Sequence, residues 1–122
     1  MSFITLLYVG MGGFVGSVLR YTLSTTLSSF TIFGIPTGTF FVNILGSFAM
    51  GYVAGTFLKN PIDEPLRLLI TYGILGGFTT FSAFSLEFFE LSLEGQFAQA
   101  AVYMLASFVL GIAFLALGYK IS

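Results

Sequence analysis

Apolar residues fill four long stretches of the chain, and short polar segments separate them. The stretches run from Phe3 into the twenties, from about Pro36 to Leu58, from Leu66 to Leu93 and from Phe97 to Tyr119. A helix that spans the hydrocarbon core of a bilayer needs about 20 apolar residues, so each stretch is long enough to cross once. The pattern predicts an all-α integral membrane protein with four transmembrane helices, in which residues 1–122 form a single transmembrane domain.

The glycine pattern predicts close contacts between these helices. Gly12 and Gly16 form a GxxxG pair in the first stretch, and Gly73 and Gly77 repeat the spacing in the third. Such pairs let helix backbones approach closely in lipid, where dispersion and weak hydrogen bonds hold helices together. We therefore expect close helix packing along both stretches.

Turn-forming residues mark the connections. A connector rich in Ser and Thr is expected from Thr22 to Thr31, and Pro36 suits the first turn of the second helix. The segment Lys59–Pro65 holds two prolines and predicts a polar turn. Gly95 suits a left-handed stop between the third and fourth helices.

Between Gly76 and Ser85, the third stretch contains glycines and hydroxyl residues that do not favour a continuous helix. Two adjacent glycines each weaken a helix by about 1 kcal/mol relative to Ala, and the hydroxyl groups that follow offer the backbone other partners. We expect the third helix to be broken mid-membrane here. Irregular backbone at that depth is tolerated only where protein buries it or where it lines a watery cavity, so the other helices should surround this segment.

Polar residues recur at helical spacing within two of the apolar stretches. Thr39, Asn43 and Ser47 stand at i, i+4 and i+8 and share one helix face. An amide at membrane depth must face protein or water. Spacing alone leaves open whether Asn43 bonds helices together or lines an aqueous path, and the same two interpretations hold for Tyr103 and Ser107.

Two charged residues within or at the edge of the apolar stretches are of functional interest. Arg20 closes the first apolar run; it either extends to the interface or sits in an aqueous vestibule that attracts anions. Glu87 lies deeper in the third stretch than Glu90 and Glu94, which we expect at the membrane surface. Glu87 is therefore the acid of greater functional interest.

Composition narrows the class of protein. Only 7% of residues are charged and 57% are hydrophobic, with a mean hydropathy of +1.01, whereas about a quarter of residues are charged in soluble domains. The first stretch lacks the basic start and cleavage site of a signal peptide, so we expect a retained helix. The formal net charge of −1 provides no basic patch, and no nucleic-acid partner is expected.

The residue types favour transport over catalysis. The chain has no His and no Cys, and no nucleophile with an evident base lies in the spans, so we do not expect an enzyme. Polar groups at membrane depth suit a translocation path. A broken helix exposes carbonyl oxygens, which favour cations, while helix N-termini and aromatic edges favour anions.

Three segments together resemble the signature of the Fluc (CrcB) fluoride channel family: Gly12–Tyr21, Gly38–Gly46 and Gly76–Glu87. They lie in the first three spans of a chain of the family's usual size. The resemblance implies a passive, fluoride-selective ion channel of the bacterial inner (plasma) membrane that exports cytoplasmic fluoride. It also implies a dual-topology homodimer of antiparallel subunits, with two pores and a central structural sodium ion but no organic cofactor.

The resemblance also implies roles for individual residues. The ring edges of Phe81 and Phe84 would meet the anion, and the amide of Asn43 would reach the pore. The other implied positions are the hydroxyl donors Thr39, Ser82 and Ser85, the sodium-binding carbonyls of Gly76 and Thr79, the vestibule residue Arg20, the pore-side acid Glu87, and a polar track begun by Tyr103 and Ser107. Gly111, one turn further along, has no side chain to continue that track.

Two alternatives compete with a fluoride channel. A small four-helix proton-coupled drug exporter needs an acid early in the substrate path, and the first stretch has none. A non-transporting scaffold subunit would use the polar residues for contacts between helices. This interpretation gives no role to the paired glycines or to the two phenylalanines after them. The charge bias between the two sides is weak, with Lys59, Arg67 and Lys120 opposite Arg20, and is compatible with antiparallel insertion.

Overall fold

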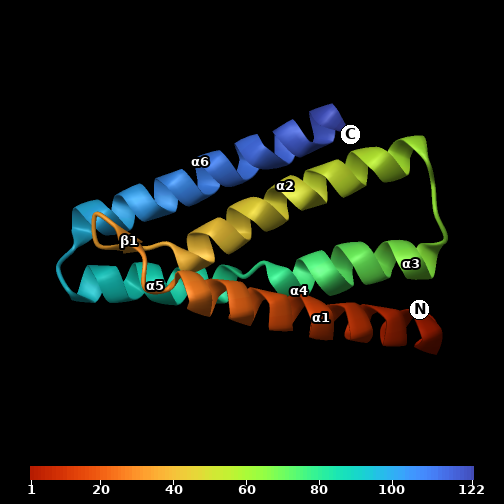
Figure 1. The fold of residues 1–122 in the computed structure, drawn as a ribbon, viewed down its shortest axis with the longest axis horizontal. Coiled ribbons are helices and arrows are strands. Elements are labelled where there is room, and N and C mark those ends of the chain that lie inside the picture. Colours follow the sequence, from red (N-terminus) through yellow and green to blue (C-terminus); the bar gives the residue numbers. More distant parts are fainter.

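Four long helical rods run antiparallel in the computed structural model, which describes residues 1–122 (Figure 1). All four are long and apolar enough to cross a membrane, which confirms the predicted number of spans. The elements are α1 (Phe3–Leu27), a hairpin of β1 (Thr31–Ile32) and β2 (Ile35–Pro36), α2 (Gly38–Lys59), a third rod of α3 (Glu64–Leu68), η1 (Leu69–Leu75), α4 (Gly76–Phe78) and α5 (Phe81–Leu93), and α6 (Phe97–Ile121).

Glycines set the two closest helix contacts. A Cβ atom on Gly12 would lie 2.4 Å from the carbonyl oxygen of Leu69, and one on Gly16 would lie 2.1 Å from that of Ile74, so α1 packs directly on η1. Across the bundle, a Cβ on Gly51 of α2 would lie 1.9 Å from the Leu115 carbonyl oxygen of α6. The predicted close helix packing is confirmed, because no side chain larger than hydrogen fits at these points.

The third rod leaves helical geometry after its glycine pair. Gly76 and Gly77 are helical, and the extended residues are Thr79, with φ −86° and ψ 156°, and Thr80, with φ −151° and ψ 123°. The hydroxyl of Thr80 then accepts a hydrogen bond from the amide of Ala83 and caps α5. The interruption thus lies inside the Gly76–Ser85 segment but after the glycine pair, where Gly77 packs against the backbone of α1 at Gly13.

The third rod also contains a π-helical segment that the sequence pattern did not predict. It covers Leu69–Leu75, directly before the glycine pair, and includes Gly73, where a Cβ atom would lie 2.8 Å from the Cα atom of Gly12 on α1. A π-helix is rare, and such segments concentrate at functional sites. The irregular part of the third rod therefore extends over more than the two extended threonines.

The connection between α1 and α2 differs from the prediction. Helix α1 continues to Leu27, and within it the hydroxyls of Thr22 and Thr26 donate to carbonyls four residues earlier. Pro36 lies in β2 opposite Thr31, so the expectation that it starts the second helix is wrong. Its strand belongs to a two-stranded hairpin, where an edge position tolerates the missing N–H.

The turn between α5 and α6 matches its prediction. Gly95 has φ +75°, a left-handed conformation that glycine adopts without strain. The amide of Gly95 donates to the carbonyl of Ser92, and that of Gln96 donates to Leu91. These bonds close the last turn of α5 and direct the chain back along α6.

Candidate functional site

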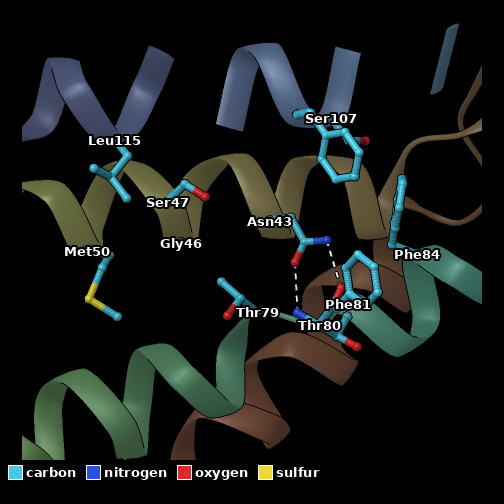
Figure 2. A pocket seen from close by; sticks show the side chains of 11 residues that line it. Asn43, Gly46, Ser47, Met50, Thr79, Thr80, Phe81, Phe84, Ser107 and Leu115 are labelled. Atoms are coloured by element: carbon cyan, nitrogen blue, oxygen red, sulfur yellow. Dashed lines mark hydrogen bonds between the residues drawn. The ribbon is translucent and has the colours of Figure 1, made fainter. Parts of the chain in front are cut away.

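An open groove of about 300 Å³ lies beside the interruption of the third rod. Helix α2 forms one wall, the Thr79–Phe81 segment another, and α6 a third (Figure 2). The lining residues are Asn43, Gly46, Ser47, Met50, Thr79, Thr80, Phe81, Phe84, Ser107, Phe108 and Leu115. None of them carries a charge, so the groove presents only neutral polar groups and apolar side chains.

Asn43 fixes the interruption through two hydrogen bonds. Its Nδ2 donates to the carbonyl oxygen of Thr80 at 2.9 Å, and its Oδ1 accepts from the amide of Thr80 at 2.8 Å (Figure 2). A side-chain amide carries a donor and an acceptor side by side, so it pairs with an extended residue as a neighbouring strand would. Asn43 therefore connects α2 to the start of α5 and also lines the groove. One of its N–H groups makes neither of these two bonds.

Phe81 and Phe84 lie on consecutive turns of α5 but in different surroundings. Their ring centroids are 5.7 Å apart, with 40° between the ring planes. Phe84 is 6% exposed and packs edge-to-face against Tyr103 at 5.1 Å, whereas Phe81 is 70% exposed. The first ring of the pair is therefore free on one side, and the second is held by the core.

Carbonyl oxygens without helical partners surround the interruption. Apart from hydrogen bonds within the helices themselves, no backbone N–H group donates to the carbonyl oxygen of Gly76 or of Thr79. The carbonyl of Gly77, between them, accepts a hydrogen bond from Nε of Arg20 at 2.9 Å. Arg20 thus reaches from α1 to the interruption, and the chain has no cluster of three acidic, His or Cys side chains that could hold a metal.

A second polar cluster lies behind Phe84, away from the groove. Glu87 accepts hydrogen bonds from the hydroxyl of Thr39 at 2.7 Å and from the hydroxyl of Tyr103. Thr39 and Tyr103 are 5% and 1% exposed, so the carboxylate is tied to buried donors on α2 and α6. Three residues from three different apolar stretches meet here, and none of them lines the groove beside Asn43.

The serines expected near the anion occupy three different settings. Ser107 lines the groove, and its hydroxyl is buried without a hydrogen-bond partner. The hydroxyl of Ser85 donates to the Phe81 carbonyl at 2.9 Å, while Ser82 is exposed, with its hydroxyl 3.3 Å from that of Thr80. A buried hydroxyl without a partner is rare, so Ser107 stands out among these serines as a donor that no protein group uses.

Thr80 and Phe108 line the groove although neither was expected there. Thr80 provides the backbone that pairs with Asn43 and the cap of α5. A threonine directly before a helix is a common N-cap, so the sequence held a signal for this role. Phe108 packs against Phe84 with centroids 5.7 Å apart, and no spacing rule distinguishes it from the other phenylalanines.

Comparison with known proteins identifies the family of this chain. Residues 7–119 match the profile of the family described as CrcB-like protein, Camphor Resistance (CrcB). The chain belongs to the CrcB-like family. The match covers nearly all of the chain and includes all four spans, and it confirms the family resemblance.

Three similar curated proteins carry the name fluoride-specific ion channel FluC. The protein from Azobacteroides pseudotrichonymphae genomovar. CFP2 is 42% identical over 112 residues, which cover 91% of this chain and 90% of the relative. The protein from Elusimicrobium minutum is 46% identical over 103 residues, with 84% and 80% covered. The one from Thermus thermophilus is 39% identical, with 94% and 92% covered. These relatives are named as channels, which agrees with the prediction that the chain is not an enzyme.

Proposed function

We propose that this protein is a passive channel selective for fluoride, which lets the anion leave the cytoplasm across the bacterial inner membrane. The observation that carries the proposal is the groove at the interruption of the third rod, which combines an amide, hydroxyl groups and aromatic rings without any fixed charge. The names of the curated relatives support fluoride as the ion. Four apolar spans fit a multi-pass membrane protein.

The donors in the groove suit a small, strongly hydrated anion. The remaining N–H of Asn43 and the unpaired hydroxyl of Ser107 are hydrogen-bond donors, and the edges of Phe81 and Phe84 carry partial positive charge. Together they replace part of the hydration shell. Because each is neutral, an ion bound there also leaves, as conduction requires.

A second copy of the chain completes the path in this proposal. The groove is open in the single chain, and Phe81 at its edge is 70% exposed, so one subunit does not enclose an ion. We propose an antiparallel homodimer in which each groove is closed by the partner, giving two pores. The interruption of the third rod then lies near the bilayer midplane, which agrees with the rule that irregular backbone occurs where protein covers it.

The carbonyls of Gly76 and Thr79 fit a sodium ion between the two copies. Hard oxygen ligands suit such a cation, and neither oxygen has a hydrogen-bond donor outside the helical ladder. Two oxygens per chain are too few for a complete shell, so both subunits contribute. When bound, the ion supplies positive charge and a link between the two interrupted rods.

The remaining implied residues form an approach to the groove in this proposal. Arg20, held at the Gly77 carbonyl, gives a vestibule a positive charge that attracts anions. The hydroxyls of Ser82 and Ser85 lie on the same turn as Phe81. Glu87, with Thr39 and Tyr103, forms a polar cluster on the far side of Phe84, and Tyr103 and Ser107 continue along α6 as a track.

The role of the aromatic pair is tested with one substitution and a matched control. Phe81→Ile removes a ring edge from the groove, whereas Phe89→Ile changes an equally large residue of the same helix that is 58% exposed and does not line it. Fluoride efflux from liposomes should fall about fivefold to thirtyfold for the first variant, if the ring supplies about 1–2 kcal/mol to the bound ion. Equal flux in both variants would remove Phe81 from the proposed path.

A further inference from the structure

The hairpin between α1 and α2 carries an apolar surface that the proposed pore does not use. Phe30, Ile32 and Phe33 are 63%, 52% and 88% exposed, and we refer to them as the hairpin tip surface. The opposite side of the hairpin packs inward, since Ile35 contacts the core cluster of Phe84, Leu91, Ala100 and Tyr103. The hairpin is thus anchored to the bundle on one side and presents large apolar side chains on the other.

Phe33 occupies a backbone conformation that its side chain disfavours. It has φ 54° and is the one residue other than glycine with a positive φ in the structure. With Gly34 at φ 77°, it forms a two-residue hairpin loop between Ile32 and Ile35. Asn, Asp or Gly usually takes this place. A strained aromatic residue at the tip of a loop points to a function for its side chain.

The hairpin lies against the membrane-spanning part of α6. Ile32, Phe33 and Ile35 line a small apolar cavity together with Val102 and Ala106. Those two α6 residues stand about 8 and 14 Å along the helix axis from Phe97, at 1.5 Å per residue. Figure 1 shows the hairpin beside the first turns of α6, without projecting past the α5–α6 turn. With α6 spanning the bilayer from its first turns, this position lies near one boundary of the bilayer.

The chemistry of the hairpin matches the region where acyl chains meet headgroups. Residues 28–37 contain no charged side chain, so attraction to anionic lipid plays no part. The backbone of a two-stranded hairpin keeps unpaired N–H and C=O groups at its edges, and these need water or headgroup partners. Exposed aromatic and aliphatic side chains beside such a backbone favour the interface.

We infer that the hairpin tip surface inserts into the interfacial layer of the bilayer, with the side chain of Phe33 among the upper acyl chains. The partner is the lipid surface itself, with no requirement for an anionic headgroup. Because the hairpin joins the end of α1 to the start of α2, insertion fixes the depth of both helices at this end of the bundle. The inference rests on the spans and the hairpin, and does not depend on which ion is conducted.

Tryptophan fluorescence tests the inference directly, since the chain has no Trp. Phe33→Trp is reconstituted as full-length protein in zwitterionic liposomes. Its emission is then quenched by lipids brominated near the headgroup end or near the methyl end of the acyl chain, or by iodide present on both sides. Val109→Trp on the exposed face of α6 serves as the bilayer control, and Asn60→Trp in the polar turn before α3 serves as the aqueous control.

The expected result is a blue-shifted emission that lipids brominated near the headgroup end quench severalfold more strongly than iodide does. Lipids brominated near the methyl end should quench Val109→Trp more than Phe33→Trp, and adding anionic lipid should change neither pattern. Strong iodide quenching, as in Asn60→Trp, would place the tip in water and overturn the inference. Blue-shifted emission that neither quencher reaches would show that protein covers the tip, as in a contact with a second copy, and would overturn it equally. Phe30→Trp gives the same readout if Phe33→Trp does not fold.

Discussion

At the scale of single residues, Asn43 combines two roles that the sequence presented as alternatives. Spacing placed Thr39, Asn43 and Ser47 on one helix face, and the structure keeps Asn43 and Ser47 at the groove. Thr39 lies one turn earlier and bonds instead to Glu87. A helical period gives a face but not the partner of each side chain, so the separation into a groove and a buried cluster could not be predicted.

Asn43→Asp should damage both the fold and the flux. A carboxylate cannot donate to the Thr80 carbonyl, and it adds negative charge to the groove. Losing one half-buried hydrogen bond and leaving its acceptor unpaired costs about 1–3 kcal/mol, so the melting temperature in detergent should fall and fluoride flux should drop by at least about tenfold. Asn60→Asp, in an exposed turn, is the control and should change neither quantity.

Ser107→Ala should separate stability from transport. The hydroxyl of Ser107 is buried without a partner, so its removal breaks no hydrogen bond and should leave the melting temperature unchanged or slightly higher. Flux should still fall severalfold if this hydroxyl binds the ion. A comparable loss in Ser92→Ala, whose hydroxyl bonds to the Phe88 carbonyl away from the groove, would contradict that role.

At the scale of helices, glycine contacts decide where the third rod stays helical. The sequence indicated an interruption between Gly76 and Ser85, and the chain leaves the helix at Thr79 and Thr80. Propensity disfavours helix at the glycine pair, but packing against α1 outweighs it. The hairpin before α2 was not predicted either, because its turn uses Phe33, which hairpin rules disfavour at that position.

Two glycines of α1 provide a matched test of the helix contact. A Cβ on Gly16 would lie 2.1 Å from the Ile74 carbonyl oxygen, whereas nothing lies within 4 Å of one on Gly10. Gly16→Ala must separate α1 from the third rod. Such overpacking typically lowers the free energy of unfolding by about 1–3 kcal/mol, so the melting temperature should fall. Gly10→Ala should be neutral or stabilising by up to about 1 kcal/mol. Equal melting temperatures would show that the two helices do not meet at Gly16.

At the scale of the whole molecule, a single chain does not enclose the groove. Only 18 of 122 residues are buried, and the groove is open along one side. Composition and hydropathy were enough to predict the four spans, because spanning a bilayer requires long apolar helices. A second subunit leaves no comparable mark in one sequence, since lipid-facing and subunit-facing side chains are both apolar.

A sodium ion held between two copies should stabilise the assembly. Protein purified throughout in sodium chloride should melt at a higher temperature than protein purified in potassium chloride or N-methylglucamine chloride of the same ionic strength. The difference corresponds to about 2–3 kcal/mol if sodium is present at about 100 times its dissociation constant. Identical melting temperatures in the three salts would contradict a sodium site at the carbonyls of Gly76 and Thr79.

Selective fluoride conduction is the central claim, and an efflux assay measures it most directly. Purified protein is reconstituted into liposomes loaded with potassium fluoride or potassium chloride, and a potassium ionophore releases the opposing voltage. We expect rapid fluoride efflux that depends on the ionophore, as for an electrogenic channel, and little chloride efflux. Equal efflux of the two anions, or no fluoride efflux at all, would contradict the account.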